Sequence, residues 1–296
     1  MSGMMCVFSP GQVTPPPILR WATGSTGGSA RYAAGAYASG SKLYNYSGIS
    51  SGAESKTLDI YDVVSRTWTT GSNGINSRQL ATANISESKM YVFGGALGPA
   101  LQTIEIYDTL ANSWTSGTSG GGVRYGHASA HYRGSIYTWG GNNGTININT
   151  LSIYNIAGNS WSAGTTGGTA RRHHTGTLSG NKIYFWGGFT TVNVNTMEIY
   201  NITANSWSTG SAGGTARYAH SSVLYNEKIY YWGGFAAAAT NTVDVYDIAR
   251  NSWSTGSLGG TARYFHSSVI LSNKVYHVAG LNAAGTPINT VDIMTI

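Results

Sequence analysis

Charged side chains are scarce in this chain: 17 Lys and Arg and 11 Asp and Glu make up 9% of its 296 residues, against about 25% in an average soluble domain. Long amphipathic helices are therefore not expected, because their exposed faces depend on Glu and Lys. The net charge of +6 is a mild excess and not the clustered basic surface that binding to nucleic acid requires. We expect no nucleic-acid partner.

Cysteine and long apolar runs are also nearly missing. The single cysteine, Cys6, excludes a disulfide framework. No apolar run reaches the roughly 20 residues of a membrane helix, so we expect no membrane insertion. The N-terminus has no basic segment and only a short apolar stretch, from which we predict that there is no signal peptide.

Glycine and aromatic residues are abundant instead, with 41 Gly, 20 Tyr and 9 Trp. Disordered chains are poor in aromatic residues, so this chain is expected to fold. The glycines show no three-residue period, which excludes collagen. The composition favours an all-β chain of short strands joined by glycine turns.

Three sequence markers recur every 46 or 47 residues, which indicates a repeat architecture. The first two occur six times, in steps of 47, 46, 47, 46 and 46 residues. The first is a Trp followed ten residues later by an Arg: Trp21 and Arg31, Trp68 and Arg78, Trp114 and Arg124, Trp161 and Arg171, Trp207 and Arg217, Trp253 and Arg263. The second is a Tyr, at Tyr44, Tyr91, Tyr137, Tyr184, Tyr230 and Tyr276. The third, a glycine pair, recurs at the same period in four units. Six units fill residues 18–296 and leave a Pro-rich head at residues 1–17.

Each unit has the pattern of four short strands. In residues 217–253 we expect strands at 220–225, 228–232, 242–246 and 252–254, separated by turn residues. A four-stranded unit cannot bury both of its faces alone, so neighbouring units must stack.

The markers together resemble the kelch repeat family. The glycine pairs Gly94-Gly95, Gly140-Gly141, Gly187-Gly188 and Gly233-Gly234, the Tyr seven residues before a Trp, and the Arg that opens each unit match that family's pattern. The resemblance covers about residues 18–296. It implies an all-β fold, a six-bladed kelch-type β-propeller with a central channel.

The chain ends indicate how the ring closes. The sixth unit has no Trp of its own, and Trp21 has no Tyr before it. We therefore predict that residues 18–22 supply the outer strand of the last blade, so that this blade is built from both ends of the chain.

The six repeat arginines allow two interpretations. Gathered at one mouth of the channel, Arg31, Arg78, Arg124, Arg171, Arg217 and Arg263 could bind a carboxylate or phosphate, because a guanidinium group accepts two oxygens side by side. Alternatively they anchor one blade to the next. Acids recur at a second fixed position and favour this structural role: Asp59, Glu105, Glu198, Asp244 and Asp292, with Ser152 as the exception.

A tyrosine directly follows four of these arginines, at Tyr32, Tyr125, Tyr218 and Tyr264. Tyrosine rings stack on the apolar faces of sugars and keep a polar edge in water. These residues are candidates for a sugar-binding mouth, and packing between blades is the alternative.

A histidine lies three residues after the arginine in four units, at His127, His174, His220 and His266. Imidazoles on successive blades could converge on a metal ion. Hydrogen-bonded structural histidines are the favoured interpretation, and we predict no metal and no cofactor.

Two enzyme types resemble kelch propellers. Galactose oxidase needs a Tyr crosslinked to Cys, and Cys6 lies outside the repeats. A sialic acid mutarotase would need an acid or His for proton transfer, and the acids outside the fixed positions are only Glu54, Glu87 and Glu227. We predict no catalytic residues and keep the mutarotase-like enzyme as an alternative.

The apolar head residues Met4, Met5, Val7 and Phe8 are candidates for docking on a protein partner in a larger assembly. We predict a non-enzymatic structural or adhesive module, such as a phage virion component on a virion or extracellular surface, that contacts proteins or glycans. An intracellular (cytoplasmic) kelch scaffold is the alternative. The variable loops after the glycine pairs, at 96–102, 142–149, 189–195, 235–241 and 281–289, are where we expect partner specificity.

Overall fold

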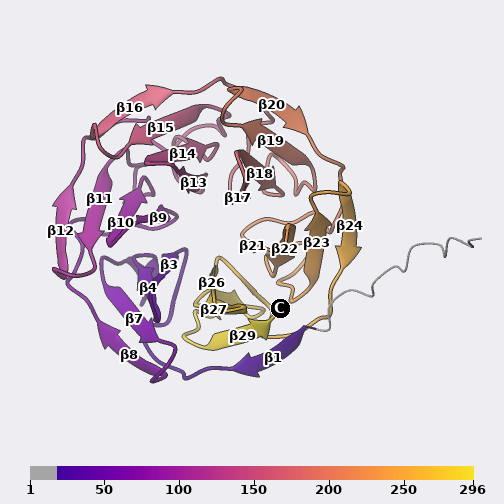
Figure 1. Cartoon of the computed structure of the whole chain (residues 1–296). Helices are drawn as coiled ribbons and strands as arrows, with labels where there is room; N and C mark the ends of the chain where they lie inside the picture. The colour runs from indigo at the N-terminus through magenta and orange to yellow at the C-terminus, as the bar shows by residue number, and fades with distance from the viewer. Residues whose placement is uncertain (1–18) are drawn as a thin grey trace, which may run out of the picture.

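The computed structural model describes residues 19–296, and the predicted head at 1–17 with its docking candidates Met4, Met5, Val7 and Phe8 lies outside the described residues. Six four-stranded antiparallel sheets stand radially around a central axis (Figure 1). The predicted six-bladed propeller is confirmed. Residues 19–296 hold no helix with the length and hydropathy of a membrane span.

Each blade contains four strands, which follow one another from the central axis to the outside of the ring. They are β3 (Gly35–Ser39), β4 (Lys42–Tyr46), β7 (Leu58–Asp62) and β8 (Thr67–Thr70) in blade 1; β9 (Thr82–Ser86), β10 (Lys89–Phe93), β11 (Ile104–Asp108) and β12 (Ser113–Ser116) in blade 2; β13 (Ala128–Tyr132), β14 (Ser135–Trp139), β15 (Leu151–Asn155) and β16 (Ser160–Ala163) in blade 3; β17 (Thr175–Ser179), β18 (Lys182–Trp186), β19 (Met197–Asn201) and β20 (Ser206–Thr209) in blade 4; β21 (Ser221–Tyr225), β22 (Lys228–Trp232), β23 (Val243–Asp247) and β24 (Ser252–Thr255) in blade 5; and β26 (Ser267–Leu271), β27 (Lys274–Val278), β29 (Val291–Thr295) and β1 (Arg20–Thr23) in blade 6. In blade 5 the predicted strands differ from these bounds by one residue at most.

The second strand of each blade is buried on both faces. In β18, Ile183 and Phe185 pack with residues of blade 3, while Tyr184 and Trp186 pack with residues of blade 5. Successive side chains of a strand point to opposite faces, so a continuous apolar run is what a strand between two neighbouring blades requires. The core is therefore a series of layers between blades.

The repeat tryptophans lie at the rim of these layers. Trp68, Trp114, Trp161, Trp207 and Trp253 are half-buried, and the indole N–H of each donates to a backbone carbonyl of the preceding blade-joining loop. The fully buried tryptophans are instead Trp139, Trp186 and Trp232, at the ends of second strands. The rim tryptophans brace one blade against the next.

Both ends of the chain build blade 6. β1 pairs antiparallel with β29, with Arg20 opposite Thr295 and Thr23 opposite Asp292. Trp21 packs against Trp232 of blade 5, with ring centroids 5.4 Å apart. The strand lies one to two residues later than the predicted 18–22, and the prediction that the N-terminal strand completes the last blade agrees with this pairing.

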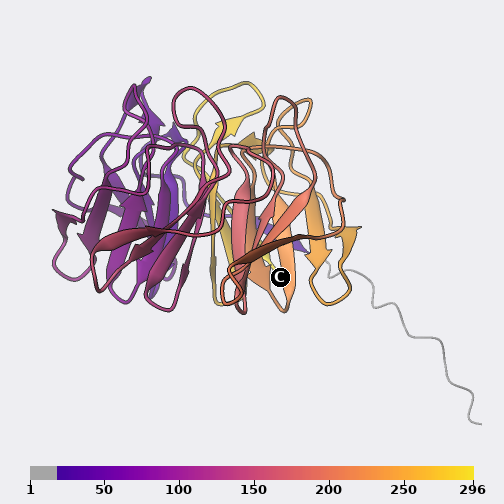
Figure 2. The ribbon, with the colours of Figure 1, turned by 90° about the horizontal axis from the view of Figure 1, so that it is seen from above.

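One face of the ring carries the longer loops (Figure 2). On it lie two additional small sheets, made of β2 (Arg31–Tyr32), β5 (Ile49–Ser50) and β6 (Ala53–Glu54) in blade 1, and of β25 (Arg263–Tyr264) and β28 (Leu281–Asn282) in blade 6. We call this the mouth face, because the repeat arginines and the loops after the glycine pairs meet there.

Candidate functional site on the mouth face

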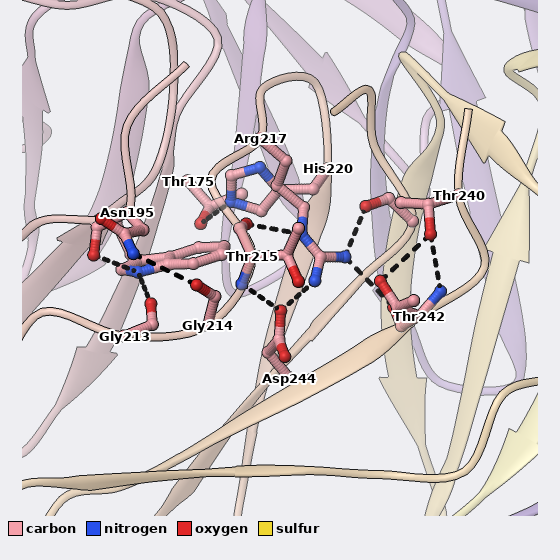
Figure 3. Close-up of polar contacts among 12 residues, drawn as sticks. Thr175, Asn195, Gly213, Gly214, Thr215, Arg217, His220, Thr240, Thr242 and Asp244 are labelled. Carbon is pink, nitrogen blue, oxygen red and sulfur yellow. Dashed lines mark hydrogen bonds and ion pairs between the residues drawn. The ribbon is translucent and has the colours of Figure 1, made fainter. Parts of the chain in front are cut away.

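The repeat arginines are buried anchors, as Arg217 illustrates (Figure 3). Its guanidinium group donates to the carbonyls of Gly233, at 2.8 Å, and Thr242, at 3.2 Å, and forms an ion pair with Asp244. The Asp244 carboxylate also accepts the backbone N–H of Thr215 at 2.9 Å. Burial lowers the pKa of Arg217, and the charge of Asp244 and its hydrogen bond act in the opposite direction. The pair joins three strands at one end of blade 5.

The same arrangement recurs in four further blades. The pairs are Arg31 with Asp59, Arg78 with Glu105, Arg171 with Glu198 and Arg263 with Asp292. All six arginines are at most 1% exposed. The structure therefore favours the structural interpretation over an anion-binding ring at the mouth, because all six guanidinium groups are buried inside the blades and five of them are paired with a carboxylate.

The anchoring differs from the predicted link between blades. Each arginine side chain bonds within its own blade, whereas its backbone carbonyl accepts an N–H from the preceding blade. That donor is Gly188 for Arg217 and Gly280 for Arg31, both at 2.8 Å. The arginine thus orders one blade through its side chain and joins two blades through its backbone.

Two residues after each arginine, a closed ring of backbone hydrogen bonds encircles the channel. Each N–H donates to the equivalent carbonyl of the preceding blade at 2.6–2.9 Å, and the bond from Ala33 to Phe265 closes the circle. The ring consists of Ala33, Leu80, Gly126, His173, Ala219 and Phe265, all with φ between 52° and 60°. Five of them are not glycine, and this left-handed conformation costs such residues about 1–3 kcal/mol each. The hydrogen bonds between all six blades hold these residues in the left-handed conformation.

Aromatic side chains surround this ring. Phe265 meets the His173 ring edge-on at 5.0 Å between centroids, and Tyr218 lies 5.6 Å from Phe235 and 6.0 Å from Phe265. Tyr264 lies 5.1 Å from Phe235. All of these side chains are half-buried. We call the following residues the aromatic collar: His173, Phe189, Tyr218, Phe235, Tyr264 and Phe265.

Of the four predicted tyrosines, the structure brings Tyr218 and Tyr264 together in the collar. Tyr32 lies at its edge, 6.5 Å from Phe265, and Tyr125 lies 6.5 Å from His173. Phe189 and Phe235 open two of the loops, 189–195 and 235–241, in which partner specificity was predicted, whereas His173 and Phe265 were not among the predicted residues. Phe189 and Phe235 directly follow a glycine pair, so an aromatic residue at that fixed position was the available signal.

The collar is electrically almost neutral. Burial lowers the pKa of His173 to about 3, and the charge of Arg172 adds to this effect. Arg172 stacks on Phe189 with 5.0 Å to the ring centroid and donates to Asn147 at 3.0 Å. Arg172 is thus the charge in direct contact with the collar.

The channel histidines pack between blades. His220 meets Trp186 of blade 4 edge-on, and its Nε2 is hydrogen-bonded to the Thr175 hydroxyl at 3.1 Å. His127 and His266 have equivalent hydroxyl partners. Burial lowers the pKa of all four histidines well below its usual value. Within the described part of the chain, no group of three or more His, Cys, Asp and Glu is placed to hold a metal ion.

One of these histidines lacks its partner. Both ring nitrogens of His174 are buried without a hydrogen bond, because Ala128 stands where the other blades have Thr or Ser. We predict that Ala128→Ser raises the free energy of unfolding by about 1 kcal/mol by supplying the missing hydroxyl. Thr175→Val should lower it by about 1–3 kcal/mol. Urea denaturation measures both, and a destabilised Ala128→Ser protein would refute the assignment.

Comparisons with known proteins agree with this architecture. The model of the Attractin/LZTR1 beta-propeller family matches residues 97–291. The chain belongs to this family. Its resemblance to kelch propellers is thereby confirmed, and the family's repeat explains why anchors, histidines and rim tryptophans occur at fixed positions.

A solved structure entitled "Structure of YjhT" is similar over 92% of this chain and 97% of that chain, with a TM-score of 0.82 and 13% sequence identity. At that identity the similarity concerns the fold alone. No curated protein matches the sequence. The family and the fold identify a β-propeller of the kind used as a binding module, and neither specifies a ligand.

Proposed function

We propose that this chain is a non-enzymatic binding module that takes a carbohydrate ligand on the aromatic collar. The observation that carries the proposal is the gathering of half-buried rings from blades 4, 5 and 6 around the channel mouth. Aromatic rings with one exposed face suit the apolar faces of sugars, and tyrosine hydroxyls add polar contacts. Such a surface can bind an uncharged sugar without charged side chains.

The neighbouring loops support a preformed site. The Asn147 amide donates to the carbonyls of Phe189 and Thr190, at 3.2 and 2.8 Å, and so ties the blade 3 loop to blade 4. Asn193 does the same for Phe235 in blade 5, at 3.3 Å. Rigid loops reduce the entropy lost on binding, and their amide-rich, uncharged surface matches a hydroxylated ligand.

The positions of the carboxylates support the non-enzymatic assignment. Five acids are paired with buried arginines. Glu87 and Glu227 lie in turns at the opposite end of their blades, and Glu54 contacts Gln79 in blade 2. Asp62 accepts hydrogen bonds from its own turn. His173 is the collar histidine that could serve in general acid–base chemistry, and its low pKa makes it a poor proton donor near pH 7.

A glycan array probed with the full chain tests the proposal. We expect a set of related glycans to bind the wild-type protein and the Tyr132→Ala protein, because Tyr132 ends β13 at the opposite end of its blade. Tyr264→Ala should lose these signals. An array without signals, or signals that Tyr264→Ala retains, would contradict carbohydrate binding at the collar.

Three further assignments stay predictions. The adhesive role on a virion or extracellular surface, and the scaffold alternative, can be tested by mass spectrometry of purified particles. The mutarotase-like alternative can be tested with any glycan that binds, by following exchange between its anomers by NMR. Exchange accelerated by wild-type protein but not by His173→Ala would overturn the non-enzymatic assignment.

A further inference from the structure

The position directly after the repeat arginine carries a charge in blade 4 alone. Blades 1, 3, 5 and 6 have a tyrosine there and blade 2 has Gln79, whereas blade 4 has Arg172. The backbone is equivalent in all six blades, since this residue pairs antiparallel with the residue after the glycine pair or its counterpart. The fold therefore does not require an arginine at this position.

The Arg172 side chain is held in one place. It is half-buried, its guanidinium group lies over the Phe189 ring at 5.0 Å from the centroid, and it donates to the Asn147 side-chain carbonyl at 3.0 Å. Asn147 is itself fixed, because its amide donates to the carbonyls of Phe189 and Thr190. A long side chain that is ordered before a ligand arrives loses less entropy when the ligand binds.

The charge of Arg172 has no counter-ion among the described residues. None of the ion pairs formed within residues 19–296 includes Arg172, and Asn147 is the one acceptor that its guanidinium group contacts there. Its neighbour Arg171 instead donates to the Gly187 carbonyl and to Glu198. A guanidinium group has five N–H donors, so most of those of Arg172 are left for a ligand.

Arg172 lies beside the rings of the aromatic collar. Phe189, over which it lies, meets Tyr218 edge-on at 5.8 Å between ring centroids. Burial raises the pKa of Tyr218, and the nearby charge of Arg172 acts against this effect. The cation and the aromatic rings therefore form one continuous surface.

We propose that the collar binds a uronic acid residue whose carboxylate pairs with Arg172. This inference rests on the proposed sugar-binding function and specifies its ligand class. The planar guanidinium group accepts two carboxylate oxygens side by side. The carboxylate of a uronic acid projects from the edge of the sugar ring, so it can reach an arginine beside the collar while the apolar face of the sugar stacks on the aromatic rings.

A glycan array with glucuronic, galacturonic, mannuronic and iduronic acid oligosaccharides, each printed as the free acid and as its methyl ester, tests the proposal. The ester keeps the sugar and its hydroxyls and removes the charge. We expect the full chain to bind at least one free acid about tenfold or more tightly than its ester, with a smaller preference at high salt. Neutral glycans bound without preference for any free acid would overturn this inference and leave sugar binding intact, whereas an array without signals would contradict both.

Two glutamine variants with the same change in net charge locate the effect. Arg172→Gln should bind acid and ester equally, and it should fold because Gln79 holds the same position in blade 2. Arg133→Gln should keep the preference, because Arg133 lies between β13 and β14 at the opposite end of its blade. Tyr264→Ala should lose acid and ester alike. A preference for the free acid that survives Arg172→Gln would refute the role of Arg172.

Discussion

Arg217→Met is expected to lower the free energy of unfolding by about 3–5 kcal/mol, because it leaves the Asp244 carboxylate buried without its cation. The whole stability of a domain is about 5–15 kcal/mol, so this single change removes a large share of it. Guanidinium chloride denaturation followed by tryptophan fluorescence measures the loss.

The same blade provides the control for this prediction. Arg250 forms an exposed ion pair with Asp247, and its side chain is 76% exposed. Arg250→Met should therefore cost less than about 1 kcal/mol. Arg217→Met combined with Asp244→Leu should recover part of the loss, since no unpaired charge remains. Equal costs for Arg217→Met and Arg250→Met would show that burial does not set the value of the anchor.

Deletion of residues 19–23 is expected to abolish cooperative unfolding. It removes β1, exposes the paired edge of β29 and removes the buried Leu19 side chain, whose loss alone costs about 2–5 kcal/mol in a core. It also uncovers Trp232, against which Trp21 packs. Circular dichroism during heating measures the transition, and an unchanged Tm would contradict the role of β1.

A circular permutant distinguishes the loss of strand β1 from the loss of the covalent link between β1 and blade 1. The permutant begins at residue 24, joins residue 296 directly to residue 1 and ends at residue 23, so that it contains every residue of the protein. It should unfold cooperatively, because β1 can still pair with β29. A permutant as disordered as the deletion variant would mean that the covalent link between β1 and blade 1, and not the pairing, holds the ring.

The sequence predicts the fold well because the fold is periodic. The phase of Trp, Arg and the glycine pairs is enough to count six blades and to assign the last one to both chain ends. The acids at the second fixed position likewise predict the partners of Arg31 and Arg217. Burial and ion pairing then follow from the requirement that a buried charge has a counter-charge.

The mouth face was less predictable, since it depends on contacts between equivalent residues of different blades. Nothing local in Ala33 or Phe265 indicates a left-handed conformation, which becomes affordable only when six N–H groups and six carbonyls meet in one circle. Phe265 and His173 belong to blades 6 and 4, and their contact follows from the radius of the ring.

Isothermal titration calorimetry with the glycan bound most strongly on the array tests the central claim, that function lies in the aromatic collar and not in the charged positions of the repeat. We predict that Tyr218→Ala weakens binding about tenfold or more, as loss of a central aromatic contact does, while Tyr132→Ala binds like the wild-type protein. Unchanged affinity in Tyr218→Ala would contradict the claim.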